Sequence, residues 1–252
     1  MTEDIKLERP ASHPGIQVIR MHRPDKKNAI TRAMYRAMAD ALDGANADED
    51  VKAAVIFGLP GIFSSGNDLA DFMEIAKNPP ESAHVLAFLH ALANFDKPLL
   101  SGVDGIAIGI GTTMNFHCDM TFTTPRTLFR TPFTDLAVVP EAASSLLGPR
   151  IMGHQRAFAM LVGGIGFSAE QAREAGIVWS VVDEDELEAA TLKAASHLIN
   201  RPRLSLMLSR KLVKGDRAEI LTRMDEEMVL FMERLRSDEA AALYKAFFEK
   251  KR

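Results

Sequence analysis

The order of the apolar runs limits the fold most: short strand-like segments fill the first half of the chain, and helical patterns dominate the second. Some of these runs alternate in polarity and others are uninterrupted, as expected of half-buried and fully buried strands. Glycines and polar turns separate them. Five runs are predicted to be strands: residues 16–21, 53–57, 99–103, 106–108 and 120–123. We therefore expect an α/β protein.

Helices are predicted where an apolar stripe follows a capping residue. Thr31 precedes the stripe formed by Met34, Met38 and Leu42. After residue 141 the pattern is almost entirely helical, with Ser168 as a cap and one strand-like interruption at 177–182. Ser237 can cap a last helix whose stripe suits a core or a subunit interface: Ala240, Leu243, Tyr244, Phe247 and Phe248.

Composition argues against several classes of protein. The chain has 252 residues, 47% of them hydrophobic, and a formal net charge of -4, with acidic and basic residues interspersed. No nucleic-acid partner is therefore expected. No apolar segment is long enough to suggest a membrane span, Cys118 is the single cysteine, and the N-terminal residues lack the apolar stretch of a signal peptide. We expect a cytoplasmic protein.

The sequence lacks the motifs of three common kinds of site: nucleotide-phosphate binding, zinc binding and serine hydrolysis. The glycines at 109 and 111 are followed by Met114 where a dinucleotide fingerprint needs glycine, and there is no Gly-Lys-Ser/Thr phosphate loop. The seven histidines include no pair at zinc-ligand spacing beside an acidic residue. No Gly-x-Ser-x-Gly elbow indicates a serine hydrolase.

Two glycine-bearing turns precede possible helices. Gly66 stands before Asn67 and Asp68, and Gly109 and Gly111 stand before a helical stretch to residue 116. Unpaired N–H groups at a helix start can receive an anion, so two such turns facing one point would form an oxyanion hole. The alternative is that these glycines only permit tight turns and close packing.

The combination of motifs resembles the enoyl-CoA hydratase/isomerase (crotonase) superfamily over nearly the whole chain. The residues that carry the resemblance are 23–30 (RPDKKNAI), 63–69 (FSSGNDL), Lys97 and Pro98, 105–109 (GIAIG), Cys118 and Asp119, and 246–251 (AFFEKK).

The resemblance implies a crotonase-like spiral of repeated β-β-α units followed by a helical trimerisation region. We place the spiral core with the acyl-CoA site at residues 1–195 and the helical region at 196–252. A homotrimer or hexamer is expected. The implied substrate is an acyl-CoA thioester, with coenzyme A entering as part of the substrate and with no metal or other cofactor.

The resemblance also assigns the reacting groups. It implies that the backbone N–H groups of Asn67 and Ile110 hold the thioester oxygen. The two glutamates of the family's hydratases map to Thr113 and Phe133, so both carboxylates are missing. Adding water calls for two positioned carboxyls, whereas moving a double bond requires only one base.

Residues 131–136 and 140–145, with 64–69, are similar to the monofunctional peroxisomal-type Δ3,Δ2-enoyl-CoA isomerases. In that subgroup the glutamate that matches Glu141 is the catalytic base. Pro140 is a good first helical residue, so we expect Glu141 in the first turn of a helix. Apolar neighbours such as Val138 and Val139 would raise its pKa. The alternative is a surface glutamate that stabilises a helix start.

Family analogy adds substrate contacts. The basic candidates for the CoA phosphates are Lys26 and Lys27, although such lysines are commonly only solvated. Asp68 is interpreted as a turn residue, and Asp135 as a possible reserve carboxylate. The residues expected to line the nucleotide, pantetheine and acyl path are Ala29, Ser65, Gly66, Asp68, Leu69, Ile106, Gly109, Thr113, Phe133, Phe247 and Lys250, with the loop 76–82.

The predicted activity is therefore Δ3,Δ2-enoyl-CoA isomerisation through a dienolate. One alternative is an enoyl-CoA hydratase, a lyase of fatty-acid β-oxidation, that uses an unexpected base such as Asp135. The other is a non-catalytic acyl-CoA binding homologue, suggested by the two absent glutamates.

Overall fold

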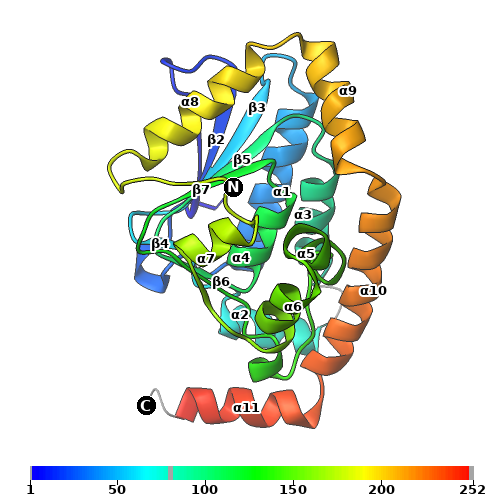
Figure 1. Ribbon diagram of the computed structural model, residues 1–252. Coiled ribbons are helices and arrows are strands. Elements are labelled where there is room, and N and C mark those ends of the chain that lie inside the picture. The colour runs from blue at the N-terminus through cyan, green and yellow to red at the C-terminus, as the bar shows by residue number, and fades with distance from the viewer. Residues whose placement is uncertain (1, 79–81, 250–252) are drawn as a thin grey trace.

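The computed structural model describes residues 2–78 and 82–249, and two sheets organise it (Figure 1). The larger sheet has the strand order β1 (Ile5–Glu8), β2 (Ile16–Met21), β3 (Ala53–Phe57), β5 (Leu99–Val103), β7 (Met120–Thr123) and β10 (Ser180–Val181). The smaller sheet has the order β4 (Ile62–Ser64), β6 (Ile106–Ile108), β8 (Leu128–Arg130) and β9 (Phe167–Ser168). All pairs are parallel except β1 with β2 and β8 with β9.

The chain passes from the larger sheet to the smaller one three times, from β3 to β4, from β5 to β6 and from β7 to β8. A helical segment follows each passage before the chain returns. This is the predicted spiral of β-β-α units, so the expected fold class is confirmed.

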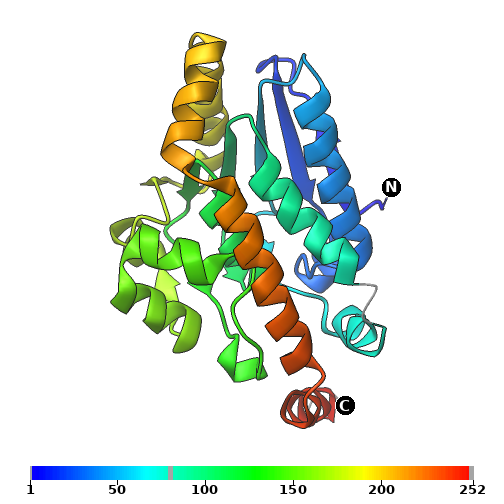
Figure 2. The ribbon, with the colours of Figure 1, turned by 90° about the vertical axis from the view of Figure 1, so that its right-hand side faces the viewer.

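The helices are α1 (Arg32–Ala47), α2 (Leu69–Lys77), α3 (Ala83–Asn94), α4 (Ile110–Thr113), α5 (Ser144–Met152), α6 (His154–Ala157), α7 (Ala169–Glu174), α8 (Leu187–Ile199), α9 (Arg203–Lys214), α10 (Arg217–Leu235) and α11 (Asp238–Glu249). Short 3-10 segments cover Pro24–Lys26, Met114–His117 and Thr134–Leu136, and a π-helical segment covers Phe158–Val162. In Figure 2, α9 and α10 run along one side of the molecule, and α11 lies at its end.

The side chains of β3 point alternately to the two faces of the larger sheet, and each face is covered by helices. Ala54 and Ile56 join the core shared with α1 and α3, whereas Val55 and Phe57 face the core formed with α8. Figure 1 shows α8 on one side of this sheet and α1 and α3 on the other. Because both faces are covered, all five residues of β3 are buried, as expected of a parallel sheet.

Most predicted elements agree with the structure. The five predicted strands have the expected bounds. Thr31 caps α1 by accepting a hydrogen bond from the Met34 N–H, and Ser168 forms a capping box on α7. The Ser237 hydroxyl likewise accepts from the Ala240 N–H in α11.

Some details differ. The strand expected at 177–182 contains only Ser180 and Val181, because residues 177–179 are bent or irregular after the turn at Ala175 and Gly176. Along α11, Ala240 and Tyr244 are buried but Leu243 is 41% exposed. The side chains of Phe247 and Phe248 lie outside the described residues. Position 196, where the helical region was placed to begin, lies inside α8, and the two-part division stays a prediction.

Candidate active site

Two turns meet at one edge of the smaller sheet. Strands β4 and β6 are parallel, so the turns that follow them leave the sheet at the same edge. A Cβ atom on Gly66 would lie 2.9 Å from the Ile108 carbonyl oxygen, and one on Gly111 would lie 3.0 Å from Ser64. Gly66 also has a φ of +88°. Glycine is therefore required here because the two backbones approach so closely.

Each turn presents a backbone N–H group without an acceptor among the described residues. Around Asn67, the Gly66 carbonyl accepts from the Ile30 N–H at 2.8 Å, and the Asp68 N–H donates to the Ile30 carbonyl at 2.9 Å. That pairing leaves the Asn67 N–H on the other side of the chain. Ile110 is the first residue of α4, so its N–H has no partner within the helix. Both groups are available to an incoming oxygen.

The side chain of Asn67 is held from the first helix. The Tyr35 hydroxyl of α1 donates a hydrogen bond of 2.6 Å to Asn67 Oδ1, and Tyr35 is only 1% exposed. The Asn67 amide oxygen is thus tied to α1, which helps to fix the turn. No local sequence signal marks Tyr35 as a site residue, because the periodicity of α1 places it simply in the core.

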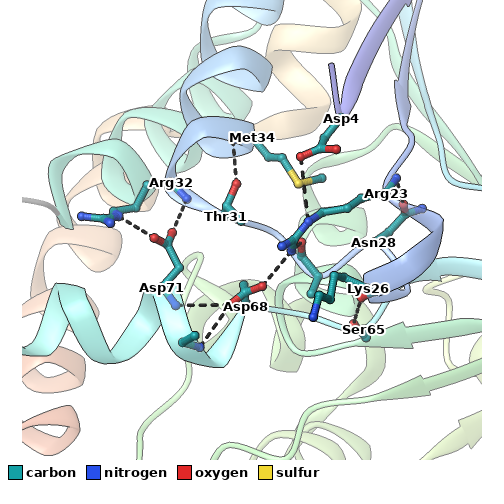
Figure 3. Close-up of polar contacts among 12 residues, drawn as sticks. Asp4, Arg23, Lys26, Asn28, Thr31, Arg32, Met34, Ser65, Asp68 and Asp71 are labelled. Carbon is teal, nitrogen blue, oxygen red and sulfur yellow. Dashed lines mark hydrogen bonds and ion pairs between the residues drawn. The ribbon is translucent and has the colours of Figure 1, made fainter. Parts of the chain in front are cut away.

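Asp68 has a structural role beside this turn (Figure 3). Its Oδ1 atom caps α2 by accepting from the Ala70 and Asp71 N–H groups, and its Oδ2 lies 2.7 Å from Arg23 Nη1. Burial alone would raise the pKa of Asp68, but these hydrogen bonds lower it overall. The same figure shows Asp71 accepting from the backbone and guanidinium of Arg32.

The lysine turn lies next to Ser65. The Ser65 N–H donates to the Lys27 carbonyl at 3.0 Å, and its hydroxyl donates to the Lys26 carbonyl at 3.4 Å. Both lysine side chains are exposed. Beneath them, the buried Asn28 amide donates to the Phe63 carbonyl at 3.1 Å. These contacts fasten the lysine turn to the end of β4.

Glu141 lies in a turn before α5 and not inside a helix, so the predicted position in a first helical turn is wrong. Ala142 and Ala143 have φ values of +60° and +53°, which interrupt any helix started by Pro140. The helix begins only at Ser144. The helix-dipole stabilisation that a first-turn position would give an ionised Glu141 is therefore absent.

Glu141 is 5% exposed, and Thr113 Oγ1 donates a hydrogen bond of 2.5 Å to its Oε1 atom. Burial is the largest effect and raises the pKa of Glu141 to about 8; the Thr113 contact lowers it, and the charge of Glu227 raises it. A carboxyl with this proton affinity can act as a base near neutral pH.

Glu141 and Asn67 line the same small cavity, of about 10 Å³. Apart from Ser82, its remaining walls are apolar and come from α2, α3 and α10: Phe72, Ile75, Val85, Met228, Phe231 and Met232. Thr113 is the last residue of α4, the short helix that follows the second turn, and Asn67 belongs to the first turn. Glu141 bonds to the former and shares a cavity with the latter, so it lies beside both turns. The apolar character of these walls suits an acyl chain, but a cavity of this volume holds at most one water molecule, so the walls must move apart before a chain can enter.

The family model described as enoyl-CoA hydratase/isomerase matches residues 11–252. The chain belongs to the enoyl-CoA hydratase/isomerase family. It is 35% identical to Enoyl-CoA delta isomerase 3, peroxisomal, from Mus musculus, over 95% of this chain and 77% of that protein. It is 34% identical to Enoyl-CoA delta isomerase 2 from Rattus norvegicus, over 86% of this chain but only 56% of that protein. The structure of Pseudomonas aeruginosa OdaA superposes with a TM-score of 0.91 at 38% identity, covering 98% of this chain and 99% of that one.

Membership confirms the recognised family and the prediction of an enzyme. Within residues 2–78 and 82–249, no helix is both long and apolar enough to cross a bilayer. One relative is described as peroxisomal, so the cytoplasmic location stays a prediction.

For this family member, the positions of the two hydratase glutamates are both buried: Thr113 is fully buried and Phe133 is 5% exposed. Asp135, the possible reserve carboxylate, is an exposed residue 2.8 Å from Arg130.

The other predicted substrate contacts lie at the ends of elements around the two turns. Leu69 begins α2, Ile106 begins β6 and Gly109 precedes α4. The carbonyl of the half-buried Ala29 accepts a hydrogen bond from Arg23. The side chain of Phe247 and all of Lys250 lie outside the described residues.

Proposed function

We propose that this family member is a Δ3,Δ2-enoyl-CoA isomerase with Glu141 as its single base. The observation that carries the proposal is the buried Glu141 carboxyl group, bonded to Thr113 beside one glycine turn and sharing a cavity with Asn67 of the other. The names of the mouse and rat relatives support the same reaction.

In the proposed mechanism, the thioester oxygen accepts hydrogen bonds from the Asn67 and Ile110 N–H groups. The ionised Glu141 carboxylate removes a proton from C2, and the electron pair of that C–H bond moves into a dienolate held by the two N–H groups. Glu141 then returns the proton to C4 as the double bond forms between C2 and C3. One carboxyl group thus acts first as base and then as acid, and no metal or redox group takes part.

Thr113 and Phe133 support isomerisation over hydration. Neither side chain can activate water or protonate carbon. Thr113 instead donates to Glu141, which stabilises its ionised form. The second candidate is a hydratase, because Glu227 supplies another buried carboxyl near Glu141. Asp135 does not favour that candidate, since it pairs with Arg130 at the surface.

The proposal is tested by assaying a 3-enoyl-CoA and a 2-enoyl-CoA ester side by side. Isomerisation should make the absorbance of the conjugated thioester rise with the first ester. Hydration would make it fall with the second. A chain that binds acyl-CoA, converts neither ester and exchanges no C2 proton in heavy water would contradict the enzyme mechanism.

The substrate is also expected to contact the lysine turn. Lys26 and Lys27 are exposed beside Ser65, at the edge of the sheet where the two glycine turns meet, which suits contacts with the CoA phosphates. A homotrimer or hexamer is supported by the apolar residues that α9 exposes: Leu204, Leu208, Leu212 and Val213.

Replacing Thr113 by valine should shift the pH dependence of the isomerase. The variant keeps the shape of the side chain but loses the donor to Glu141, so the pKa of Glu141 should rise further. The limb of kcat/KM that reports this base should move to higher pH, and the rate at pH 7 should fall about tenfold. Thr191→Val, a buried substitution in α8, is the matched control and should leave the profile unchanged. An unshifted Thr113→Val profile would show that Glu141 is not the titrating base.

A further inference from the structure

A second buried acid reaches the Glu141 turn from α10. Glu227 is 5% exposed, although glutamate is rarely buried without a partner. Its Oε1 atom accepts a hydrogen bond of 2.9 Å from the Ser145 N–H, in the first turn of α5. Helix α10 lies beside α5 (Figure 1). Glu227 therefore ties α10 to the chain four residues after Glu141.

The turn from 141 to 145 needs such external contacts. Its two alanines occupy the left-handed region, which is costly for residues with a Cβ atom. On one side His117 Nε2 donates to the Ala142 carbonyl at 2.7 Å, and Thr113 donates to Glu141. On the other side stands Glu227. The turn is thus held between the segment that follows β6 and helix α10.

The second oxygen of Glu227 is the unexplained feature. Its Oε2 atom is buried and has no hydrogen-bond partner among the described residues. The amide oxygen of a glutamine could accept the hydrogen bond from the Ser145 N–H equally well. That hydrogen bond alone therefore does not explain why a glutamate is buried at position 227. The other acid close to it is Glu141.

We propose that Glu227 is a positioning residue for Glu141: it fixes the turn that carries the proposed base through its hydrogen bond to Ser145, and it adds a second buried acidic group next to that turn. The proposal rests on the isomerase function proposed above. Met228, Phe231 and Met232 of the same helix line the cavity that Glu141 enters, so α10 supplies both the apolar wall and the supporting acid.

The effect on proton affinity agrees with this geometry. Burial raises the pKa of Glu227, which the contacts with Ser145 and Arg223 oppose, and the charge of Glu227 contributes to the raised pKa of Glu141. Two nearby acids cannot both ionise freely, so their titrations are coupled. Glu227 thereby makes Glu141 a stronger base.

Other titratable groups face this pair from the surrounding elements. Arg223 on α10 donates to the Ser145 hydroxyl at 3.2 Å, and His117 of the 3-10 segment donates to the Ala142 carbonyl. Tyr35 of α1 donates to Asn67, which lines the same cavity as Glu141. Burial lowers the pKa of His117 to about 4 and raises that of Tyr35 well above 10. Both are neutral between pH 5 and 9, where the two glutamates should dominate the profile.

The test is the kcat/KM profile of Glu227→Gln with a 3-enoyl-CoA ester. Glutamine keeps an acceptor for Ser145 but carries no charge, so the limb assigned to Glu141 should move to lower pH by about one unit, the interaction needed for coupled titration. The plateau should fall severalfold because Glu141 becomes a weaker base. The matched control is Glu233→Gln, an exposed residue of α10, whose profile should equal that of the wild type. An unshifted limb in Glu227→Gln, with or without a lower kcat, would overturn the proposal.

A second measurement separates this proposal from the function itself. The carboxyl carbons of Glu141 and Glu227 can be titrated by NMR in the wild-type protein, without substrate or a variant. Each resonance should show two inflections because the acids are coupled. Independent single titrations would overturn the role of Glu227 even in an active isomerase, whereas coupled titrations in a chain without isomerase activity would reject only the proposed function.

Discussion

Glu141→Gln should lower kcat for 3-enoyl-CoA isomerisation by about 10³-fold while leaving acyl-CoA affinity nearly unchanged. Glutamine has almost the same volume and can still accept the hydrogen bond from Thr113, so the cavity keeps its shape. It cannot take up a proton from C2. Steady-state kinetics and calorimetric titration with a saturated acyl-CoA would measure the two effects separately.

The stability of the same variant provides a control for folding. The folded pKa of Glu141, about 8, lies above the unfolded value of about 4.3. The contribution of Glu141 to the free energy of unfolding is therefore fully present below pH 4 and is lost as pH rises through 8. The total loss is at most about 5 kcal/mol. Glu141→Gln does not titrate, so it should unfold less readily than the wild type at pH 9. An inactive variant that is also less stable at pH 9 would indicate damage to the fold, and a fully active variant would rule out Glu141 as the base.

Gly66→Ala should reduce kcat by about 10²-fold, the loss expected when one oxyanion donor is displaced. The added Cβ would lie 2.9 Å from the Ile108 carbonyl, and the φ of +88° disfavours alanine. The turn should shift and move the Asn67 N–H away from the thioester oxygen. The free energy of unfolding should also fall by about 1–3 kcal/mol.

The control for this substitution is Gly44→Ala in α1. A Cβ there would have no neighbour within 4 Å, and alanine favours the helix, so the variant should be fully active and slightly more stable. Wild-type kcat in Gly66→Ala, with the expected loss of stability, would mean that the first turn supplies no oxyanion donor.

The strands could be predicted because their apolar runs are long enough to show a period. Residues 53–57 and 99–103 gave the observed bounds of β3 and β5. By contrast, β4 and β8 contain three residues each, too few for a period, and were not predicted. Strand β6 is equally short but was predicted, because Gly105 and Gly109 mark both of its ends. The two turns that we propose as the oxyanion hole could be located because glycines mark them.

The surroundings of Glu141 could not be predicted locally. Pro140 suggested a helix start, but Ala142 and Ala143 adopt positive φ without the glycine or asparagine that normally signals it. Tyr35 and Glu227 contact the site only because α1 and α10 pack around it, far away in the sequence. Contacts between residues so far apart in the chain produce no spacing pattern that could be recognised in a single sequence.

The most direct test is a crystal structure with a saturated acyl-CoA bound. We expect the thioester oxygen about 3 Å from both the Asn67 and Ile110 nitrogens, with a Glu141 carboxyl oxygen in contact with C2. A thioester oxygen bound elsewhere, or C2 out of reach of Glu141 while the acyl chain fills the cavity, would contradict the account.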